Sequence, residues 1–509
     1  MEIINFTLSV EALIMTKRLH DITNFGGTDA DEDALLIEAF EDHRAFESLK
    51  AHKRFCVLGR KGSGKTAIFK KFLSQGSWDK FAFGHTFSDY PWHFHEKQKS
   101  IGVPEEQCYV QSWQYLCYIT LAKLLLNNDS SQPYSDGAAE HLSRLERFVL
   151  DSYGTRDPDV TQIFTPSKTL KFSGDVGVNW KILKGGLKIE SAPISDLPLI
   201  VQEVNQNIRH ATIQSLNPAL DYYVLFDQLD LGFSLEARDY TSRIVGLLLA
   251  AREINLHARS AGKRVTIGVF LRDDIYDRLQ FEDKNKITEN FCDHVVWDHG
   301  PKSNTLKSLM EKRIKVVFSA SRQKWDEVFD ERHEMSGRQR KYNYILDRTF
   351  LRPRDMIKFC NECLNSVRAA GGNPDMFENK HIIDAQENFS DYLHRELDDE
   401  IHKHIPEYRR YFEVIKNLDS LQFTLKDFEE VWAARKNLFS GNEDPITALR
   451  ELFDFSVVGY LALGGGGGGS QYVWKYKDAR SQFNEGAAQL RVHPGFKEVL
   501  GLKKFTRAG

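Results

Sequence analysis

The sequence predicts an α/β protein, with a parallel sheet between helices in its first part and mainly helices after it. Three observations predict this fold class. The apolar run Phe55–Gly59 leads through a glycine-rich turn into a segment whose apolar residues recur at helical spacing. Two further apolar runs, 222–227 and 264–271, are separated by a helical stretch, as strands of a parallel sheet are. After about residue 300 this alternation ends and helical patterns dominate.

Length and composition narrow the class of protein. The 509 residues suffice for two or three domains, and 41% hydrophobic and 28% charged residues are typical of an ordinary globular chain. The formal net charge of −4 excludes a protein that is basic overall, so a contact with DNA would need a local patch. Six cysteines without regular spacing do not form a disulfide framework. We find neither a bilayer-spanning apolar run nor a signal pattern, and we expect a cytoplasmic protein without membrane contact.

The glycine-rich turn after the first strand carries the most specific motif. It reads GRKGSGKT and matches the pattern G-x-x-x-x-G-K-[ST] in full. In this pattern backbone N–H groups surround phosphate oxygens, the lysine reaches the β- and γ-phosphates, and the hydroxyl completes the shell of a Mg²⁺ ion. The sequence therefore predicts binding of ATP and Mg²⁺. The residues expected to hold them are Gly59, Arg60, Lys61, Gly62, Ser63, Gly64, Lys65, Thr66 and Ala67.

The segments around this motif have less specific patterns. An acidic amphipathic helix is predicted over 29–49, either beside the adenine or simply covering the edge of the sheet. We expect a second strand at 81–87 and core helices at 110–126 and 195–214. Between these helices, Leu170–Ser191 alternates small, apolar and polar residues, which predicts a β-hairpin. That hairpin either touches a partner or nucleic acid, or is an exposed insertion without a ligand.

A buried strand ends in the acid that a nucleotide site needs. The apolar run that begins at Tyr222 ends at Asp227, which a parallel strand would deliver to the carboxyl edge of the sheet. There Asp227 would orient Mg²⁺ through a water beside Thr66. The next residue is Gln228, whose amide binds water but accepts no proton. We therefore expect slow hydrolysis, unless Asp230 or another acid substitutes as the base.

Arginines at two later positions are candidate phosphate sensors. Arg272 ends the strand 264–271, and its alternative role is a salt bridge to Asp273 or Asp274. Arg352 and Arg354 stand at the start of a strong helix, where Pro353 fits the first turn and Asp355 favours the positive end. These two arginines either reach across to the phosphates or make structural ion pairs.

The last hundred residues have the pattern of a small separate domain. Helices are predicted at 406–418, 424–437 and 445–454. Two strands are predicted at 455–463 and 471–476, on either side of the run Gly464–Gly469. This is the element order of a winged helix. Because the candidate recognition helix 445–454 is not notably basic, a protein-contacting or autoinhibitory role stands beside a DNA-reading one.

With these motifs in view, the chain resembles the P-loop ATPases of the AAA+/STAND grouping, especially bacterial ATPases related to origin-recognition initiators. The resemblance rests on GRKGSGKT, VLFDQLD, FLRDD, FLRPRDMIKF and FSVVGY…VWKY…VHP. It implies an N-terminal extension over 1–30, an ATPase domain over 31–300 with a hairpin insertion at about 165–192, a helical lid over 301–400 and a winged helix over 401–509.

The resemblance also implies roles for single residues. Lys65 and Thr66 would bind phosphate and Mg²⁺, Asp227 would hold Mg²⁺, Arg272 would be the first sensor, and Arg352 or Arg354 the lid sensor. Gln228 departs from the AAA+ pattern and is similar to the STAND form, in which a second acid, here Asp230, follows.

Proteins of this grouping use ATP as a switch for conformation and oligomerisation, and many bacterial relatives resemble parts of anti-phage defence modules. We therefore expect a slow ATPase that controls self-assembly or a separate partner effector. The alternative is an initiator- or clamp-loader-like ATPase that binds duplex DNA through the winged helix. A small-molecule kinase is a third reading, disfavoured by the long helical C-terminal half.

Overall fold

A computed structural model describes residues 17–86, 105–128, 133–164, 169–172, 182–184, 187–193, 196–229, 238–300, 304–402, 404–439, 443–464 and 469–503. The chain divides into two compact units. Asp42–Val295 form the first, which we call the sheet unit. The described residues on either side of this range form the second, which we call the helical unit. The sheet unit is therefore inserted into the helical unit and joined to it by two chain crossings.

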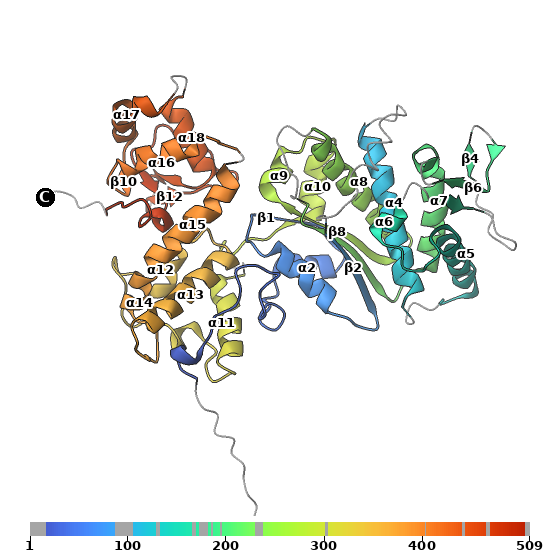
Figure 1. Cartoon of the computed structure of the whole chain (residues 1–509), viewed down its shortest axis with the longest axis horizontal. Helices are drawn as coiled ribbons and strands as arrows, with labels where there is room; N and C mark the ends of the chain where they lie inside the picture. Colours follow the sequence, from blue (N-terminus) through green and yellow to red (C-terminus); the bar gives the residue numbers. More distant parts are fainter. Residues whose placement is uncertain are drawn as a thin grey trace, which may run out of the picture. The chain divides into compact units, whose positions relative to one another are not determined.

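The sheet unit is built on one five-stranded sheet in the order β2-β7-β8-β1-β9, in which every neighbouring pair is parallel (Figure 1). Its strands are β1 (Cys56–Gly59), β2 (Lys80–Thr86), β7 (Asp221–Asp227), β8 (Arg264–Arg272) and β9 (Cys292–His294). The α/β class with a parallel sheet is thus confirmed. The strand that precedes the GRKGSGKT turn lies inside the sheet, with β8 on one side and β9 on the other.

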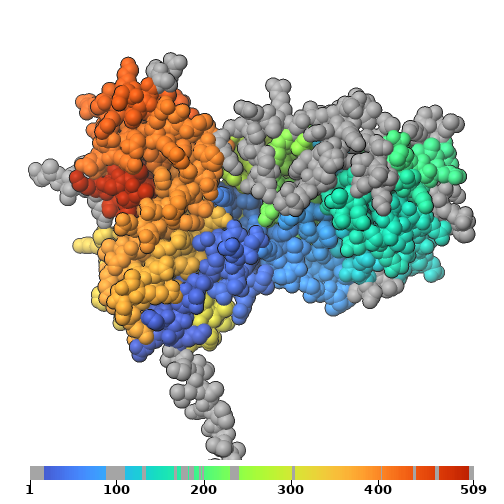
Figure 2. Space-filling view, viewed as in Figure 1, coloured from blue at the N-terminus to red at the C-terminus, as the bar shows by residue number. Residues whose placement is uncertain are grey.

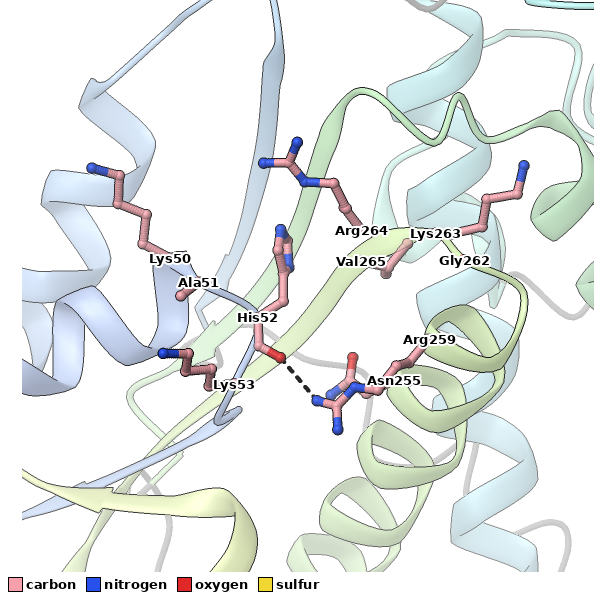
Figure 3. A pocket seen from close by; sticks show the side chains of 10 residues that line it. All are labelled: Lys50, Ala51, His52, Lys53, Asn255, Arg259, Gly262, Lys263, Arg264 and Val265. Atoms are coloured by element: carbon pink, nitrogen blue, oxygen red, sulfur yellow. Dashed lines mark hydrogen bonds between the residues drawn. The ribbon is translucent and has the colours of Figure 1, made fainter.

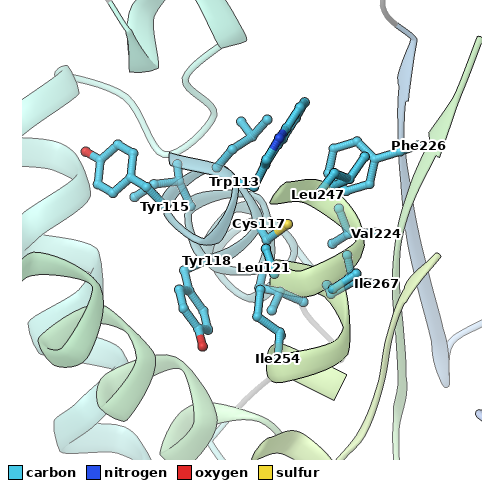
Figure 4. Close-up of a cluster of buried hydrophobic side chains, with 14 of the residues drawn as sticks. Trp113, Tyr115, Cys117, Tyr118, Leu121, Val224, Phe226, Leu247, Ile254 and Ile267 are labelled. Atoms are coloured by element: carbon cyan, nitrogen blue, oxygen red, sulfur yellow. The ribbon is translucent and has the colours of Figure 1, made fainter. Parts of the chain in front are cut away.

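Helices connect these strands and bury the sheet. They are α1 (Arg44–Lys50), α2 (Lys65–Ser74), α4 (Glu105–Leu126), α5 (Asp136–Tyr153), α6 (Val160–Ile163), α7 (Leu197–Ser215), α8 (Arg238–Ser260), α9 (Asp273–Arg278) and α10 (Lys284–Phe291). In Figure 4, Trp113 and Cys117 of α4 and Leu247 of α8 pack beside Val224 and Ile267 of the sheet, and all five are fully buried. Within the described ranges, no helix is both long and apolar enough to cross a bilayer.

The helix predicted over 29–49 is largely wrong. Only Arg44–Lys50 are helical, and residues 29–38 form turns. The buried carboxylate of Asp33 explains the difference, because it accepts hydrogen bonds from the N–H groups of Gly27 and Leu35 at 3.0 and 3.1 Å. The same carboxylate pairs with buried Arg313 at 2.6 Å. These contacts hold residues 29–41 in the helical unit, where Figure 2 shows the blue surface of this part of the chain against yellow and orange residues.

Short antiparallel strands follow α6. They are β3 (Thr169–Lys171), which pairs with β6 (Ser191–Pro193), and β4 (Leu183–Lys184), which pairs with β5 (Leu187–Lys188). The antiparallel pairing predicted for Leu170–Ser191 is therefore present among the described residues of this segment.

The helical unit consists of short and long helices and one small sheet. Its helices are η1 (Leu19–Asp21), α11 (Leu306–Val317), η4 (Trp325–Glu327), α12 (Lys341–Leu346), α13 (Pro353–Ala369), α14 (Asn379–Asp384), α15 (Gln386–Ile401), α16 (Tyr408–Lys416), α17 (Leu425–Ala434), η5 (Lys436–Leu438), α18 (Pro445–Asp454) and η6 (Pro494–Phe496). Its antiparallel sheet has the order β10-β13-β11-β12. These strands are β10 (Gln422–Phe423), β11 (Val458–Ala462), β12 (Gln471–Val473) and β13 (Leu490–Val492). β11 and β12 pair on either side of the glycine run, of which residues 465–468 lie outside the described chain.

Candidate nucleotide site

The turn between β1 and α2 needs glycine at three positions. Gly62 and Gly64 have φ values of 76° and 105°, in the left-handed region that only glycine adopts without strain. Gly59 has an ordinary φ, but a Cβ added there would lie 2.5 Å from Ser63 Oγ. The backbone therefore folds tightly on itself over these residues, and α2 begins directly behind the turn at Lys65.

Lys65 points back into this turn. Its ammonium group donates hydrogen bonds to the carbonyl oxygens of Gly59 and Arg60, at 2.8 and 3.0 Å. The two carbonyls hold the charge over the turn. An arriving phosphate could take up the same charge with little movement of the side chain. Thr66 and Ala67 follow as the second and third residues of α2, and Arg60, Lys61 and Ser63 complete the turn.

The second motif ends on the same edge of the sheet. Asp227 is the last residue of β7 and is only 3% exposed. The register pairs Phe226 with Val269, and Val269 with Cys56, so Asp227 lies about two residues short of the level of Gly59. A buried acid at the carboxyl edge of a parallel sheet is well placed to act on a bound ligand.

The residue after Asp227 leaves the strand in a strained conformation. Gln228 has a φ of 58°, which costs a non-glycine residue roughly 1 kcal/mol. Its amide is half-buried. Asp230, the predicted substitute base, lies outside the described residues.

Arg272 lies beside the glycine-rich turn. The register pairs it with Gly59, so the ends of β8 and β1 are level. Its guanidinium donates two hydrogen bonds to the carboxylate of Asp274, at 3.0 and 2.7 Å. This ion pair is the alternative that the sequence offered for Arg272, and its sensor role stays a prediction.

The sequence indicates Asp273 only as a possible salt-bridge partner of Arg272. Asp274 takes the ion pair with Arg272, and Asp273 is left close enough to Arg60 and Lys65 for both cations to act on its carboxylate. Burial raises the pKa of Asp273 above its ordinary value, and Arg60 and Lys65 oppose this increase. A partly desolvated acid thus lies in the field of Lys65. The sequence signal for this acid is the pair of aspartates that follows Arg272 at the end of the strand.

The predicted lid arginines lie in the helical unit, in networks of carboxylates. Arg352 is 2% exposed and donates to Asp355 and Glu400, both at 2.9 Å. Arg354 pairs with Glu396 at 2.9 Å and donates to the carbonyl of Thr28. These contacts correspond to the structural ion pairs that the sequence analysis considered for both arginines. Their role in sensing phosphate stays a prediction.

Within the part of the chain that the structure describes, no group of three or more His, Cys, Asp or Glu side chains could hold a metal by itself. Mg²⁺ at a phosphate site takes most of its oxygens from water and from phosphate and needs only one or two protein ligands. Thr66 and Asp227 are the residues that would supply them.

Two comparisons with known proteins bear on the chain. Residues 304–398, which run from α11 into α15, match the family described as the FunZ-associated C-terminal helical domain. The chain is also 24% identical over 370 residues to the "Putative transposon gamma-delta 80.3 kDa protein" of Escherichia coli strain K12. That similarity covers 67% of this chain and 47% of the relative, so the chain spans about half the length of the curated relative that it matches.

Proposed function

We propose that the chain is a P-loop ATPase that binds ATP with Mg²⁺, hydrolyses it slowly, and acts as a nucleotide-controlled switch. The switch would control self-assembly or a partner effector protein. The observation that carries this proposal is the turn between β1 and α2, with Lys65 held over it by the carbonyls of Gly59 and Arg60.

The residues of this turn fit a chain of phosphates. Gly59 leaves no room for a side chain, and Gly62 and Gly64 let the backbone turn its N–H groups inward. Lys65 can exchange two neutral carbonyls for charged oxygens, which are stronger acceptors. When bound, Mg²⁺ would neutralise charge on the phosphates.

Slow hydrolysis follows from the residues at the sheet edge. Gln228 can orient a water but cannot take its proton. Asp273 can take a proton and lies in the field of Lys65 and Arg60, so we assign it the role of proton acceptor. Neither Asp273 nor the other candidate base, Asp230, directly follows Asp227, which supports a slow ATPase.

A route from the phosphate turn to the rest of the chain supports the switch. Val295, the last residue of the sheet unit, donates its N–H to the carbonyl of Leu58 at 2.7 Å. Its side chain would lie 3.3 Å from a Cβ at Gly59. A change in the turn on nucleotide binding would thus act on the residue from which the chain crosses into the helical unit.

An alternative is an initiator-like ATPase that acts on duplex DNA. The relative is described as a putative transposon protein. The helices α16, α17 and α18 followed by the antiparallel pair β11–β12 have the element order of a winged helix. In this reading the last domain, rather than a partner protein, would be the output of the switch.

The deciding experiment measures the mass of the particle in solution without nucleotide, with ADP–Mg²⁺ and with a non-hydrolysable ATP analogue, each with and without a DNA duplex. Assembly that follows the nucleotide alone supports the switch. Assembly only on DNA supports the initiator-like alternative. A particle that binds no nucleotide and never changes mass contradicts both.

Exchanging Asp273 for asparagine should lower ATP turnover roughly 100-fold, because the amide cannot accept a proton. The raised pKa of Asp273 has a sign that can be tested: the carboxylate is the active form, so turnover of the parent should fall as the pH drops through that pKa. The variant should lack this decrease. Phosphate release over a pH series measures both effects.

The rescue variant is Gln228→Glu, which adds an acid beside Asp227. In the Asp273→Asn protein it should restore part of the turnover, and in the parent it should raise the rate. If Asp273→Asn turns over ATP like the parent, Asp273 is not the proton acceptor.

A further inference from the structure

A basic cavity lies at the amino ends of the strands β1 and β8. The glycine-rich turn lies at the opposite, carboxyl ends of these strands. Its volume is about 560 Å³, within the range of small-ligand sites. The loop between α1 and β1 forms one wall, and the end of α8 with the start of β8 forms the other (Figure 3). Its charged or titratable lining residues are Lys50, His52, Lys53, Arg259, Lys263 and Arg264.

The lining has one sign of charge. It holds five Lys or Arg side chains and neither Asp nor Glu, although the chain has a net charge of −4. Asp221 lies nearby and pairs with Arg264 at 2.6 Å, which neutralises that guanidinium. Lys50, Lys53 and Arg259 are exposed, and in the described chain they pair with no carboxylate. Three uncompensated cations therefore surround the cavity.

His52 holds one wall in an unusual conformation. Its φ is 54°, yet it occupies the position after a helix end that glycine normally takes. Its ring stacks on Tyr223 and bonds Thr266 Oγ1 at 2.7 Å and Asp221 at 2.8 Å. Its carbonyl accepts a hydrogen bond from Arg259 at 2.9 Å, the dashed line in Figure 3. The strained residue thus ties the two walls together and sets Lys50 and Lys53 on either side of itself.

The ring of His52 does not add to the positive charge near neutral pH. Burial lowers its pKa, and the charges of Arg264 and Arg259 act in the same direction, against the opposing effect of Asp221. Its role here is to position the loop. The charge comes from the lysines and arginines.

Helix ends explain only part of the basic lining. Lys50 and Arg259 stand in the last turns of α1 and α8, where cations are favoured by the helix dipole. Lys53 and Lys263 lie outside both helices. Lys263 is held at the cavity by the carbonyl of Leu216 and the hydroxyl of Tyr134, both at 2.6 Å, so a neutral frame positions its charge.

We propose that this cavity binds phosphate groups in a row, either from the backbone of a nucleic acid or from a free oligophosphate. Lysine and arginine side chains without carboxylate partners are the usual donors to phosphate oxygens. The five Lys and Arg side chains of the lining disfavour a cationic ligand. Since the cavity is at the other edge of the sheet from Lys65, this site is separate from the proposed ATP site.

The test uses the full chain with Lys65→Ala, so that the phosphate turn does not capture the probes. The probes are a labelled DNA duplex and inorganic tripolyphosphate. The variant carries Lys50→Gln, Lys53→Gln and Arg259→Gln. The matched control carries Lys315→Gln, Arg340→Gln and Lys436→Gln, three exposed cations of the helical unit with the same loss of charge.

If the cavity binds DNA, the slope of log affinity against log salt should become shallower by roughly 2 to 3 in the cavity variant and stay unchanged in the control. If it binds a free oligophosphate, tripolyphosphate affinity should fall at least tenfold in the variant while DNA affinity does not change. Equal binding of both probes by variant and control, or no binding by the parent, would overturn the proposal.

Arg259 also makes the hydrogen bond to His52, so its replacement could disturb the fold. A second variant with only Lys50→Gln and Lys53→Gln avoids this, because the ammonium group of neither lysine donates a hydrogen bond in the described chain. Its melting temperature should equal that of the parent, and its DNA salt slope should become shallower by roughly 2. A stable double variant with unchanged binding of both probes would also overturn the proposal.

Discussion

Lys65→Ala is expected to lower the affinity for ATP roughly 100-fold, equivalent to about 2.7 kcal/mol. The alanine removes the ammonium group that hydrogen bonds to the carbonyls of Gly59 and Arg60 hold over the turn. Charged hydrogen bonds to phosphate are among the strongest that a side chain makes. Titration with a fluorescent ATP analogue measures the loss.

The matched control for this prediction is Lys70→Ala. Lys70 is on the same helix, α2, but more than a turn beyond the glycine-rich turn. It should bind ATP like the parent. Melting curves of both variants separate a lost contact from a lost fold, and parent-like affinity in a folded Lys65→Ala protein would disprove the phosphate role of the turn.

Asp227→Asn should leave ATP binding close to that of the parent and lower Mg²⁺-dependent turnover roughly 10–100-fold. The exchange keeps the shape of a side chain that is 3% exposed and removes its charge. A carboxylate that orients Mg²⁺ through water acts on the metal more than on the nucleotide. Phosphate release over a Mg²⁺ series measures the effect.

Asp221→Asn is the control, since Asp221 is the first residue of β7 and Asp227 is the last. It should weaken the contacts of His52 and Arg264 without changing the Mg²⁺ dependence of turnover. If Asp227→Asn hydrolyses ATP at the parent rate, β7 does not supply the acid of the site.

The sheet was predictable because its strands carry local signals. Buried parallel strands are continuous apolar runs, and 222–227 and 264–271 show them without any tertiary information. The helix prediction for 29–49 failed because the structure of this segment depends on a distant residue. Its apolar spacing is helical, but Asp33 is engaged by Arg313, which lies 280 residues away. A long-range ion pair of this kind leaves no trace in a local window.

The candidate site was predictable to the same degree. The glycine-rich turn and Asp227 are motif positions, and the structure places both at the carboxyl edge of the sheet. The sequence does not indicate which of the two acids after Arg272 pairs with it. The structure shows that Asp274 makes this ion pair. The basic cavity was missed because its residues come from the ends of three elements and share no motif.

The strand order has a consequence for synthesis of the protein. β1 pairs with β8 and β9, which are made about 200 residues later, so β1 leaves the ribosome without its neighbours. At the usual elongation rates this interval lasts roughly 10–40 s. Arg313, the ion-pair partner of Asp33, is made still later, 280 residues after it. The nascent chain therefore exposes an apolar strand for many seconds, the kind of surface that molecular chaperones bind.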